Sequence, residues 1–416
     1  MKVDTVVLGA GIVGTSVALS LQKKGHAVAL IDRAGIATET SFGNAGLIQR
    51  EAVYPYGFPR SLRELLRIAT NRNIDVHYQL LALPSLAPFL WKYRRNSRPP
   101  RYLAIARHYA TLIEHSTVET RAMAVGAGVE ALLRHDGWLK TFHTRRAMDM
   151  HVRASESWQR EFGINARVLD QVALHATEPF INRSMVGGLL YIDSDSVADP
   201  AALVEGFAAH FSKLGGRFCR GDAQTLEKRG GRWQVQTENG PVEAASAVMA
   251  LGAWSNALIS KFGYRMPLGV KRGYHMHYRP LGDATLNHPV FDVEHGYLLA
   301  PMARGIRLTT GAEFAFFDAP KMPVQLERAE PLARTIFPLG HRLDPEPWMG
   351  RRLCTPDMLP VIGPAPRHQS LWFAFGHAHH GLTLGAVTGR LLAEMIVGED
   401  PFIDPQPFRA DRPELL

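Results

Sequence analysis

A glycine-rich turn near the start of the chain constrains its fold more than any other feature. Three glycines, Gly9, Gly11 and Gly14, follow an apolar strand at 6–8 and precede a helical segment. The first glycine permits a tight turn, the second lets the backbone approach a phosphate, and the third lets helix and strand pack closely. The helix then begins with unpaired N–H groups and a partial positive charge, which favour an anion. The pattern predicts a pyrophosphate-binding turn.

The residues after this turn extend the same unit. Val17 and Leu21 continue a helical face, and Gly25 is placed to end the helix. A second apolar strand, 27–31, ends on Asp32, roughly 20 residues past the glycines, where a carboxylate suits the ribose hydroxyls of an adenine dinucleotide. The sequence therefore predicts a Rossmann-type nucleotide domain, although Asp32 alone does not distinguish FAD from NAD.

Length and composition bound the rest of the chain. With 416 residues, the chain is long enough for two cooperating domains, and 46% hydrophobic with 21% charged residues is typical of an ordinary globular protein. No run of 18 apolar residues predicts a membrane span, and the first residues do not resemble a secretory signal. The two cysteines, Cys219 and Cys354, form no disulfide framework. These features lead us to expect a cytoplasmic protein.

The formal net charge of +8 is accompanied by no nucleic-acid-binding motif, so no nucleic-acid partner is expected. The densest basic stretch, from Lys92 to Arg101, follows an apolar segment at 80–90. It has two interpretations. It is either a solvated helix end beside core residues, or a patch that docks on anionic lipid at the inner face of a membrane or on a partner subunit.

The pattern in the middle of the chain predicts segments that are inserted between parts of the nucleotide-binding domain. Helices are expected in much of 60–160, and Asp199-Pro200 starts a further helix that Gly215-Gly216 ends. Strands are expected in the segments that follow. The first begins near 218, others flank the turns at 230–231 and 239–240, and further strands are expected at 247–251 and in much of 271–310.

Two features favour a flavin over a nicotinamide. After Asp32 the chain forms a loop of small residues, 41–46, whose backbone can lie against an extended cofactor. A second strand–glycine–helix unit comes near the end, with a strand at 371–375, a loop at 376–383 and a helix that Gly398 ends. Such a helix start, directed at the pyrimidine edge of an isoalloxazine, would stabilise the anion of a reduced flavin.

These blocks carry a resemblance to a known family. Together with Gly350-Arg351-Arg352, Thr355-Pro356-Asp357 and 360–363, they resemble the FAD-dependent D-amino-acid oxidase superfamily, most closely bacterial D-amino-acid dehydrogenases and D-hydroxyproline-dehydrogenase-like proteins. The resemblance implies an α/β fold with α+β elements, in which a Rossmann-type FAD-binding domain joins a substrate-binding domain of mixed β-sheet and helices. The expected division assigns 1–80, 195–262 and 345–416 to the FAD-binding domain, and 81–194 and 263–344 to the substrate-binding domain.

The motif and the resemblance together indicate the residues that bind FAD. They are Gly9, Gly11, Ile12, Val13, Gly14, Asp32, Arg33, Thr40, Ser41, Asn44, Ala45, Gly46, Leu47, Gly252, Trp254, Gly376, His377, Gly381, Leu382 and Thr383. The flavin-tethering cysteine of sarcosine-oxidase-like members lies further upstream than Cys354, so non-covalent FAD is expected. Glycine oxidases carry an arginine where this chain has His379, which argues against glycine or sarcosine as substrate.

Four residues are candidates for the chemistry. The resemblance places Arg352 on the family's carboxylate-binding arginine, and a guanidinium fork matches a carboxylate. The alternative is an interdomain ion pair, a role that suits Arg351 better. Tyr274 can donate to the substrate carboxylate or gate the pocket, or it is a core aromatic. His379 and His380 can accept the amine proton or contact substrate.

His377, close to these two histidines, suits a structural or flavin-contacting role. No metal site is expected, because no Cys, Asp or Glu at ligand spacing accompanies the three histidines. Tyr54 and Tyr56, soon after the flavin loop, form either a mobile lip over the pocket or a plain loop.

The leading hypothesis is FAD-dependent oxidation of a D-amino acid or cyclic imino acid, with hydride transfer from Cα to flavin N5 and hydrolysis of the imine to an oxo acid. An alternative is an oxygen-using oxidase of glycine, sarcosine or another secondary amine. A third is the flavin subunit of a multi-chain dehydrogenase complex. The sequence does not identify the electron acceptor, for which a quinone or another respiratory-chain component is the expected class.

Overall fold

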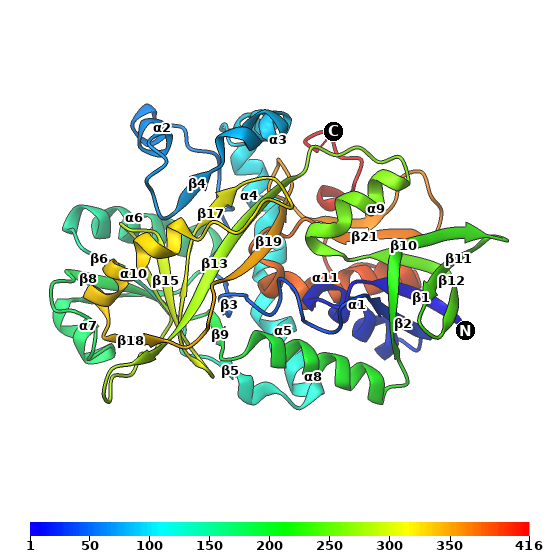
Figure 1. Ribbon diagram of the computed structural model, residues 1–416, viewed down its shortest axis with the longest axis horizontal. Coiled ribbons are helices and arrows are strands. Elements are labelled where there is room, and N and C mark those ends of the chain that lie inside the picture. Colours follow the sequence, from blue (N-terminus) through cyan, green and yellow to red (C-terminus); the bar gives the residue numbers. More distant parts are fainter. Residues whose placement is uncertain (416) are drawn as a thin grey trace.

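The computed structural model describes residues 1–415 and contains two large sheets joined by helices and a small third sheet. In Figure 1 the seven-stranded sheet, with the N-terminus, lies on the right, and the eleven-stranded sheet lies on the left. The predicted α/β architecture, with a Rossmann-type half and a mixed-sheet half, is confirmed.

The first sheet has a parallel core in the order β10-β2-β1-β12-β21. Leu8 pairs with both Ile31 and Met249, so the carboxyl ends of three strands meet at the glycine turn. β11 is antiparallel to β10 and β12, and β20 is antiparallel to β21. The bounds are β1 (Lys2–Leu8), β2 (Val28–Asp32), β10 (Arg217–Arg229), β11 (Arg232–Thr237), β12 (Gly240–Met249), β20 (Val361–Pro364) and β21 (Leu371–Phe375).

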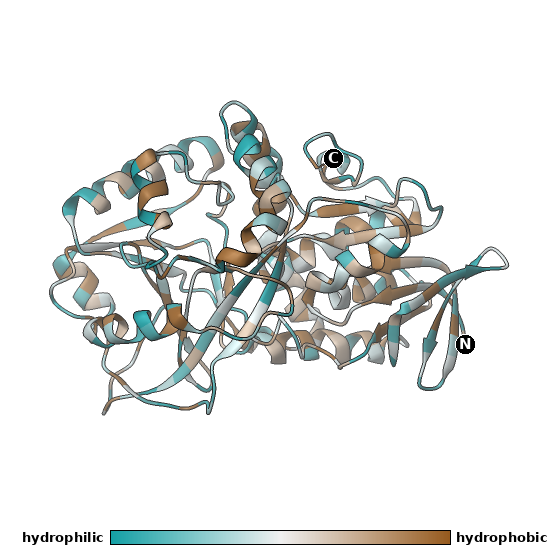
Figure 2. Cartoon of the chain, turned by 45° about the horizontal axis from the view of Figure 1, so that its top comes forward, coloured by the Kyte–Doolittle hydropathy of each residue, from teal (hydrophilic) through white to brown (hydrophobic). Residues whose placement is uncertain are grey.

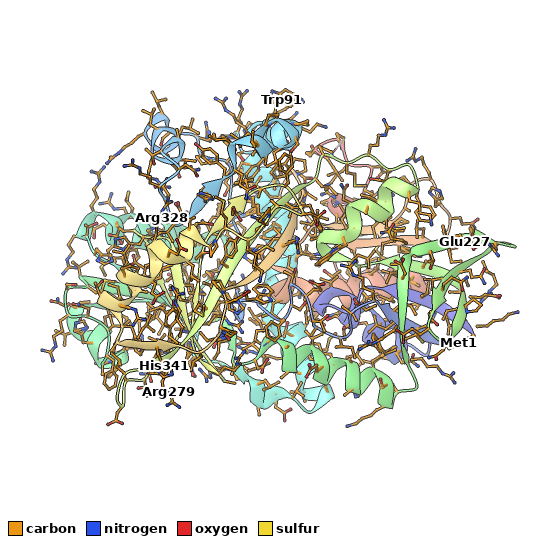
Figure 3. The ribbon with its side chains drawn as sticks, in the orientation of Figure 1. Met1, Trp91, Glu227, Arg279, Arg328 and His341 are labelled. Atoms are coloured by element: carbon orange, nitrogen blue, oxygen red, sulfur yellow. The ribbon has the colours of Figure 1, made fainter. Side chains whose placement is uncertain are left out.

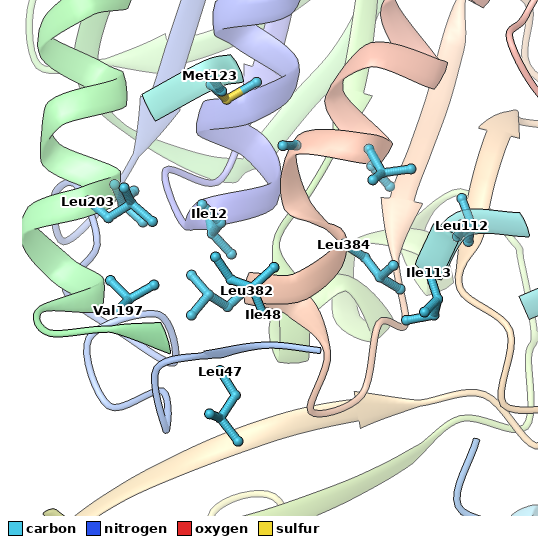
Figure 4. Close-up of a cluster of buried hydrophobic side chains, with 14 of the residues drawn as sticks. Ile12, Leu47, Ile48, Leu112, Ile113, Met123, Val197, Leu203, Leu382 and Leu384 are labelled. Carbon is cyan, nitrogen blue, oxygen red and sulfur yellow. The ribbon is translucent and has the colours of Figure 1, made fainter. Parts of the chain in front are cut away.

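Four helices on this side pack together: α1 (Ile12–Lys23), α5 (Ser116–Ala127), α8 (Pro200–Lys213) and α11 (Gly381–Val397). α1 and α11 approach closely because α11 presents glycines to α1: a methyl group on Gly389 would lie 2.6 Å from the Ser16 carbonyl oxygen. Figure 4 shows Ile12 of α1 and Leu382 of α11 within one apolar cluster, which also takes in side chains from mid-chain segments. Segments distant in sequence therefore share one core beside the glycine turn.

The second sheet follows the order β4-β17-β13-β16-β15-β14-β6-β8-β7, with β18 and β19 also paired to β13. Helices α6 (Arg145–Phe162), α7 (Gln171–Thr177) and α10 (Val324–Ile336) pack against its strands. The strand bounds are β4 (Val76–Tyr78), β6 (Trp138–Phe142), β7 (Ala166–Asp170), β8 (Gly187–Tyr191), β13 (Gly269–Pro280), β14 (Val290–Asp292), β15 (Tyr297–Met302), β16 (Gly305–Thr309), β17 (Ala312–Phe314), β18 (Leu339–Arg342) and β19 (Trp348–Cys354).

The remaining elements connect or flank the two sheets. The small sheet contains β3 (Leu47–Ile48), β9 (Asp195–Val197) and β5 (Leu133–Arg134). The other helices are α2 (Leu62–Ala69), α3 (Leu83–Asn96), α4 (Arg101–Glu114) and α9 (Ser255–Lys261), with short 3₁₀ turns that include η1 (Leu80–Ala82) and η3 (Gly252–Trp254). α2 and α3 lie along the upper edge of Figure 1.

Hydrophobic segments in Figure 2 follow the inner strands of the first sheet, whereas its projecting hairpins are largely hydrophilic. Among residues 1–415, no helix has the length and apolar character needed to cross a bilayer.

Strand pairing differs from the expected domain division in places. β4 and β19, both assigned to the FAD-binding domain, hydrogen-bond in the second sheet, while α5, assigned to the substrate-binding domain, packs on α8 and α11. Position 416, the end of the last expected range, lies outside the described residues. The division into two domains stays a prediction, and these three elements mark where its boundaries need to move.

Candidate cofactor and substrate site

A cavity opens where the carboxyl ends of β1, β2 and β12 meet the beginning of α1. Its walls come from the glycine turn, the end of β2, the loop at 38–41, the Arg351-Arg352 block and the segment at 376–381, whereas the predicted blocks 355–357 and 360–363 do not line it. The predicted cofactor residues along it are Gly9, Gly11, Ile12, Val13, Asp32, Arg33, Thr40, Ser41, Gly252, Trp254, Gly376, His377 and Gly381, and Arg352 joins them.

The glycine turn has the geometry that a pyrophosphate seat requires. Gly9 has a φ of +103°, and a methyl group there would lie 2.5 Å from the Ala250 carbonyl oxygen. A methyl group on Gly14 would lie 1.9 Å from the Gly9 carbonyl oxygen, so only glycine permits this packing of helix on strand. Gly11 precedes α1 without a side-chain cap, which leaves most of the first-turn N–H groups available to an anion. The turn therefore fits a dinucleotide.

Asp32 is held in place at the end of β2. Its two carboxylate oxygens accept hydrogen bonds from the Ala10 N–H at 2.9 Å and the Ala34 N–H at 2.8 Å. The opposite side of the turn is fixed by Ser41, whose hydroxyl oxygen accepts from the Ile12 N–H at 2.9 Å. The backbone thus positions Asp32 on the cavity wall, where the sequence predicted a ribose-binding carboxylate.

Several wall residues were not predicted. Glu39 lines the cavity, and burial raises the pKa of its carboxyl group, opposed by the nearby Arg33 and Arg351. The segment 221–224 lines it as well, because β10 pairs in parallel with β2 and brings Arg220 beside Asp32. No local motif marks this segment, and only the pairing of β10 with β2 reveals it.

Other predicted cofactor residues lie outside the wall: Gly14, Asn44, Ala45, Gly46, Leu47, Leu382 and Thr383. Some of them support the loop. The Thr383 hydroxyl donates to the Leu47 carbonyl at 3.1 Å, and the Asn44 side-chain oxygen accepts from the Gly46 N–H at 2.9 Å. Direct contact of these residues with a cofactor stays a prediction.

Arg352 has the surroundings expected of an anion-binding arginine. It is half-buried in β19, and its Nη1 donates to the Gly311 carbonyl at 3.2 Å. It forms no ion pair with a carboxylate among residues 1–415. Its neighbour Arg351 donates instead to the Phe317 carbonyl at 3.0 Å and lies over the Phe317 ring, which occupies its guanidinium.

The two histidines directly before α11 differ in whether a ring nitrogen is free to accept a hydrogen bond. The Nδ1 of His380 faces the Tyr109 hydroxyl at 2.5 Å and its Nε2 faces the Gln49 side-chain oxygen at 3.1 Å, so both ring nitrogens are occupied. The Nε2 of His379 is buried and unpartnered within residues 1–415, and its ring packs on Tyr56 with centroids 5.1 Å apart. Burial, with His380, Arg352 and Lys271 nearby, holds the pKa of His379 well below its usual value. Neither histidine is among the residues that line the cavity, and of the two only His379 has a ring nitrogen free to accept a hydrogen bond.

The side chains of His377 and Tyr274 each hydrogen-bond to other residues of the protein. His377 Nε2 lies 2.9 Å from the Thr388 hydroxyl, and burial lowers the pKa of His377 to about 3. The Tyr274 hydroxyl donates to Glu313 at 2.7 Å and accepts from the Met322 N–H at 2.9 Å. Because this hydroxyl is fully used and does not line the cavity, Tyr274 fits the core alternative rather than the catalytic one.

Two clusters outside the cavity combine histidine with aspartate: His143, Asp292 and His295, and His275, His277 and Asp344. In the first cluster both histidines hydrogen-bond one Asp292 oxygen, at 3.0 and 2.7 Å. In the second, His277 hydrogen-bonds Asp344 at 2.7 Å. These hydrogen bonds are enough to hold the side chains of each cluster close together. The expectation that the chain holds no metal stays a prediction.

Comparisons with known proteins agree with this geometry. Residues 4–395 match the family described as FAD dependent oxidoreductase. The chain is 32% identical to a D-amino acid dehydrogenase from Cereibacter sphaeroides, over 96% of this chain and 93% of that one. It is 28% identical to a D-amino-acid oxidase from Bradyrhizobium diazoefficiens, over 98% of each. Glycine oxidase from Geobacillus kaustophilus shares the fold, with a TM-score of 0.75 at 20% identity over 99% of each chain.

Proposed function

Because the chain belongs to the FAD dependent oxidoreductase family, we propose that it oxidises a D-amino acid or cyclic imino acid at the Cα–N bond. The product is an imine, which water hydrolyses to an oxo acid. The observation that carries the proposal is Arg352, a cation without a carboxylate partner in residues 1–415, on the wall of the FAD cavity. The names of the D-amino acid dehydrogenase and oxidase relatives support it.

FAD, when bound, supplies a two-electron acceptor for the hydride that leaves the substrate Cα. The glycine turn and the start of α1 would hold its pyrophosphate, and Asp32 would hold its ribose. We propose that the attachment is non-covalent, since Cys354 is not among the residues that line the cavity.

The protein positions the substrate and holds its amino group. Arg352 would bind the carboxylate with two parallel hydrogen bonds and thereby fix the direction of the Cα–H bond. His379 is held in its neutral form, so its Nε2 can accept a hydrogen bond from the substrate amino group, while the proton that leaves the ammonium group passes to solvent. Tyr56 packs on the His379 ring.

We further propose that the electrons pass to a quinone or another respiratory-chain component, and that the basic segment 92–101 brings the protein to the inner face of an anionic membrane. Trp91, directly before this segment, has 61% of its surface exposed and lies at the top edge of Figure 3. Arginines and an exposed indole are the side chains that favour a lipid interface. The cytoplasmic location stays a prediction.

The test is anaerobic bleaching of the flavin absorbance near 450 nm, the ordinary position of a flavin band, by a panel of amino acids. We expect D-amino acids or D-proline analogues to bleach it, L-amino acids to leave it unchanged, and acid precipitation to release free FAD. Bleaching by glycine or sarcosine alone, or by no member of the panel, would contradict the proposal.

Two measurements separate the alternatives. Dye reduction without peroxide indicates a dehydrogenase, while stoichiometric peroxide in air indicates an oxygen-using oxidase. Gel filtration of the active chain addresses the third alternative, since a homogeneous active species without other subunits argues against an obligate multi-chain complex.

A further inference from the structure

Two cations stand opposite each other on a pair of strands, β13 and β19, of which β19 lines the cavity. Lys271 of β13 and Arg352 of β19 are register partners in an antiparallel ladder. Directly opposed residues project on the same face, with Cβ atoms about 5 Å apart. Arg272, the next residue along β13, projects to the other face, where its Nε donates to Glu313 at 2.8 Å. One face of this pair thus carries a neutralised arginine, and the other carries Lys271 and Arg352.

The two head groups take different directions. The Arg352 guanidinium lies over Gly273, where a methyl group would come within 2.3 Å of its Nη2, and it extends to the Gly311 carbonyl. The Lys271 ammonium extends to Tyr93: its Nζ donates to the Tyr93 hydroxyl at 3.4 Å and lies 4.6 Å from the ring centroid. Each cation therefore offers its own donor position.

Neither cation has a carboxylate within 4.0 Å in the described part of the chain. Both are half-buried, and both act on the same neighbour, because Arg352 and Lys271 each lower the pKa of His379. A charge removed from water without a counterion is unfavourable, and proteins ordinarily supply a partner, as Glu313 does for Arg272. Arg352 lines the cavity and Lys271 stands beside it in register, and two such positive groups without a carboxylate partner indicate a ligand with two negative groups.

We propose that Lys271 forms a second anion-binding subsite and that the substrate is a D-amino acid with an acidic side chain. The α-carboxylate binds Arg352, and the side-chain carboxylate binds the Lys271 ammonium, which the Tyr93 hydroxyl orients while it donates its own proton to the Tyr56 carbonyl. Phe314, whose ring centroid is 5.4 Å from Lys271 Nζ, forms an apolar wall for the intervening methylene groups. This inference rests on the proposed function and specifies the substrate class of the same site.

The experiment compares D-glutamate with its neutral isostere D-glutamine in wild type and Lys271→Met. Methionine keeps an unbranched side chain that is one atom shorter, and it removes the charge. We expect wild type to favour D-glutamate in kcat/KM, and Lys271→Met to lose at least about tenfold toward D-glutamate and less than about threefold toward D-glutamine. Lys228→Met is the matched control, since Lys228 also lies over an aromatic ring, 5.4 Å from that of Trp233, on the far hairpin of the first sheet.

A binding measurement separates this subsite from the reaction. Glutarate and butyrate differ by one carboxylate, and each can be titrated against the holoenzyme while the flavin spectrum is recorded. We expect Lys271→Met to weaken glutarate binding about tenfold or more and to leave butyrate binding unchanged. Flavin content and the thermal midpoint of unfolding of each variant verify that it is folded.

Three outcomes overturn the inference: no preference for D-glutamate over D-glutamine, equal losses toward both substrates, which would place Lys271 on the α-carboxylate, or no effect, which would make Lys271 structural. If no D-amino acid bleaches the flavin but glutarate still distinguishes wild type from Lys271→Met, the proposed function fails and the anion subsite stands.

Discussion

Arg352 is the residue on which substrate binding depends most directly. A carboxylate that loses its buried cationic partner loses about 2–5 kcal/mol of interaction free energy, and each 1.4 kcal/mol is about tenfold in affinity. We expect Arg352→Ala to lower kcat/KM at least about tenfold while the enzyme retains its FAD, because the glycine turn and Asp32 are distant in sequence and separately held. Steady-state kinetics with the flavin content measured in parallel provides the test.

Arg367→Ala is the matched control for that variant. Arg367 also packs on an aromatic ring, with its guanidinium carbon 4.5 Å from the Tyr264 centroid, but it is not among the residues that line the cavity. An unchanged kcat/KM in Arg352→Ala, or the loss of FAD from that variant alone, would remove the substrate role from Arg352.

At the scale of single residues, the sequence predicted the residues that line the cofactor cavity better than the residues proposed to bind the substrate. Gly9, Gly11 and Asp32 belong to one local motif whose spacing specifies their task, and all three line the cavity. Lys271 was not singled out, because its importance depends on its register with Arg352 in another strand. The strand itself, Gly269–Pro280, also carries Arg272, two histidines and Arg279, so a lysine within it gave no local signal. The two roles considered for Tyr274 stayed open for the same reason, since its partner Glu313 is remote in sequence.

At the scale of elements, α2 and the segment from η1 to α3 present apolar side chains to solvent. Leu62 and Leu66 of α2 are 72% and 62% exposed, Leu80 and Leu81 of η1 are 72% and 83% exposed, and Trp91 follows in α3. No residue of α2 is buried, so its apolar side has no partner within the described residues. Arginines flank both helices. Exposed leucines bordered by arginines have the composition of a surface that binds anionic lipid.

We therefore expect the protein to co-sediment with phosphatidylglycerol vesicles more than with phosphatidylcholine vesicles, and less as salt rises, because screening weakens the attraction of the arginines. Leu80→Ser/Leu81→Ser should reduce the bound fraction several-fold without changing activity on a soluble dye. Val172→Ser, a change at a valine 79% exposed on α7, serves as the control. Equal or absent binding to both vesicle types would contradict the lipid surface and favour a protein partner.

Elements with clear local end signals were predicted well, and those defined by pairing were not. α8 begins where Asp199 accepts hydrogen bonds from the Ala201 and Ala202 N–H groups, and α11 ends at Gly398 in the left-handed conformation, both as the sequence indicated. β4 and β19 joined the second sheet, contrary to their expected domain. A cap is encoded within a few residues, whereas the partner of a strand depends on the whole topology.

At the scale of the whole molecule, buried histidines make stability depend on pH. Burial lowers the pKa of His275 to about 2, and that of His377 and of His380 to about 3. An unfolded histidine titrates near about 6.5, so between these values the unfolded chain binds more protons than the folded one. The contribution of these histidines to the free energy of unfolding is therefore greatest above about pH 6.5. It falls as pH decreases, by about 2 kcal/mol for each such histidine at about pH 5.

Urea unfolding of the holoenzyme at about pH 7.5 and about pH 5.5 tests this expectation, with a lower midpoint expected at the acidic pH. His275→Gln should reduce the pH slope by about one proton, even though it loses the stacking on Trp348 at both pH values. His341→Gln, at an exposed position labelled in Figure 3, should leave the slope unchanged. A midpoint that is the same at both pH values would show that the buried histidines do not control stability.

The packing of α1 against α11 also bears on the order in which the cofactor cavity is assembled. The pyrophosphate turn is synthesised well before Gly376 and α11, which supply the facing wall. Until those segments fold against it, the turn is half of a pocket. We therefore expect FAD to bind stably only to a chain in which α11 already packs on α1.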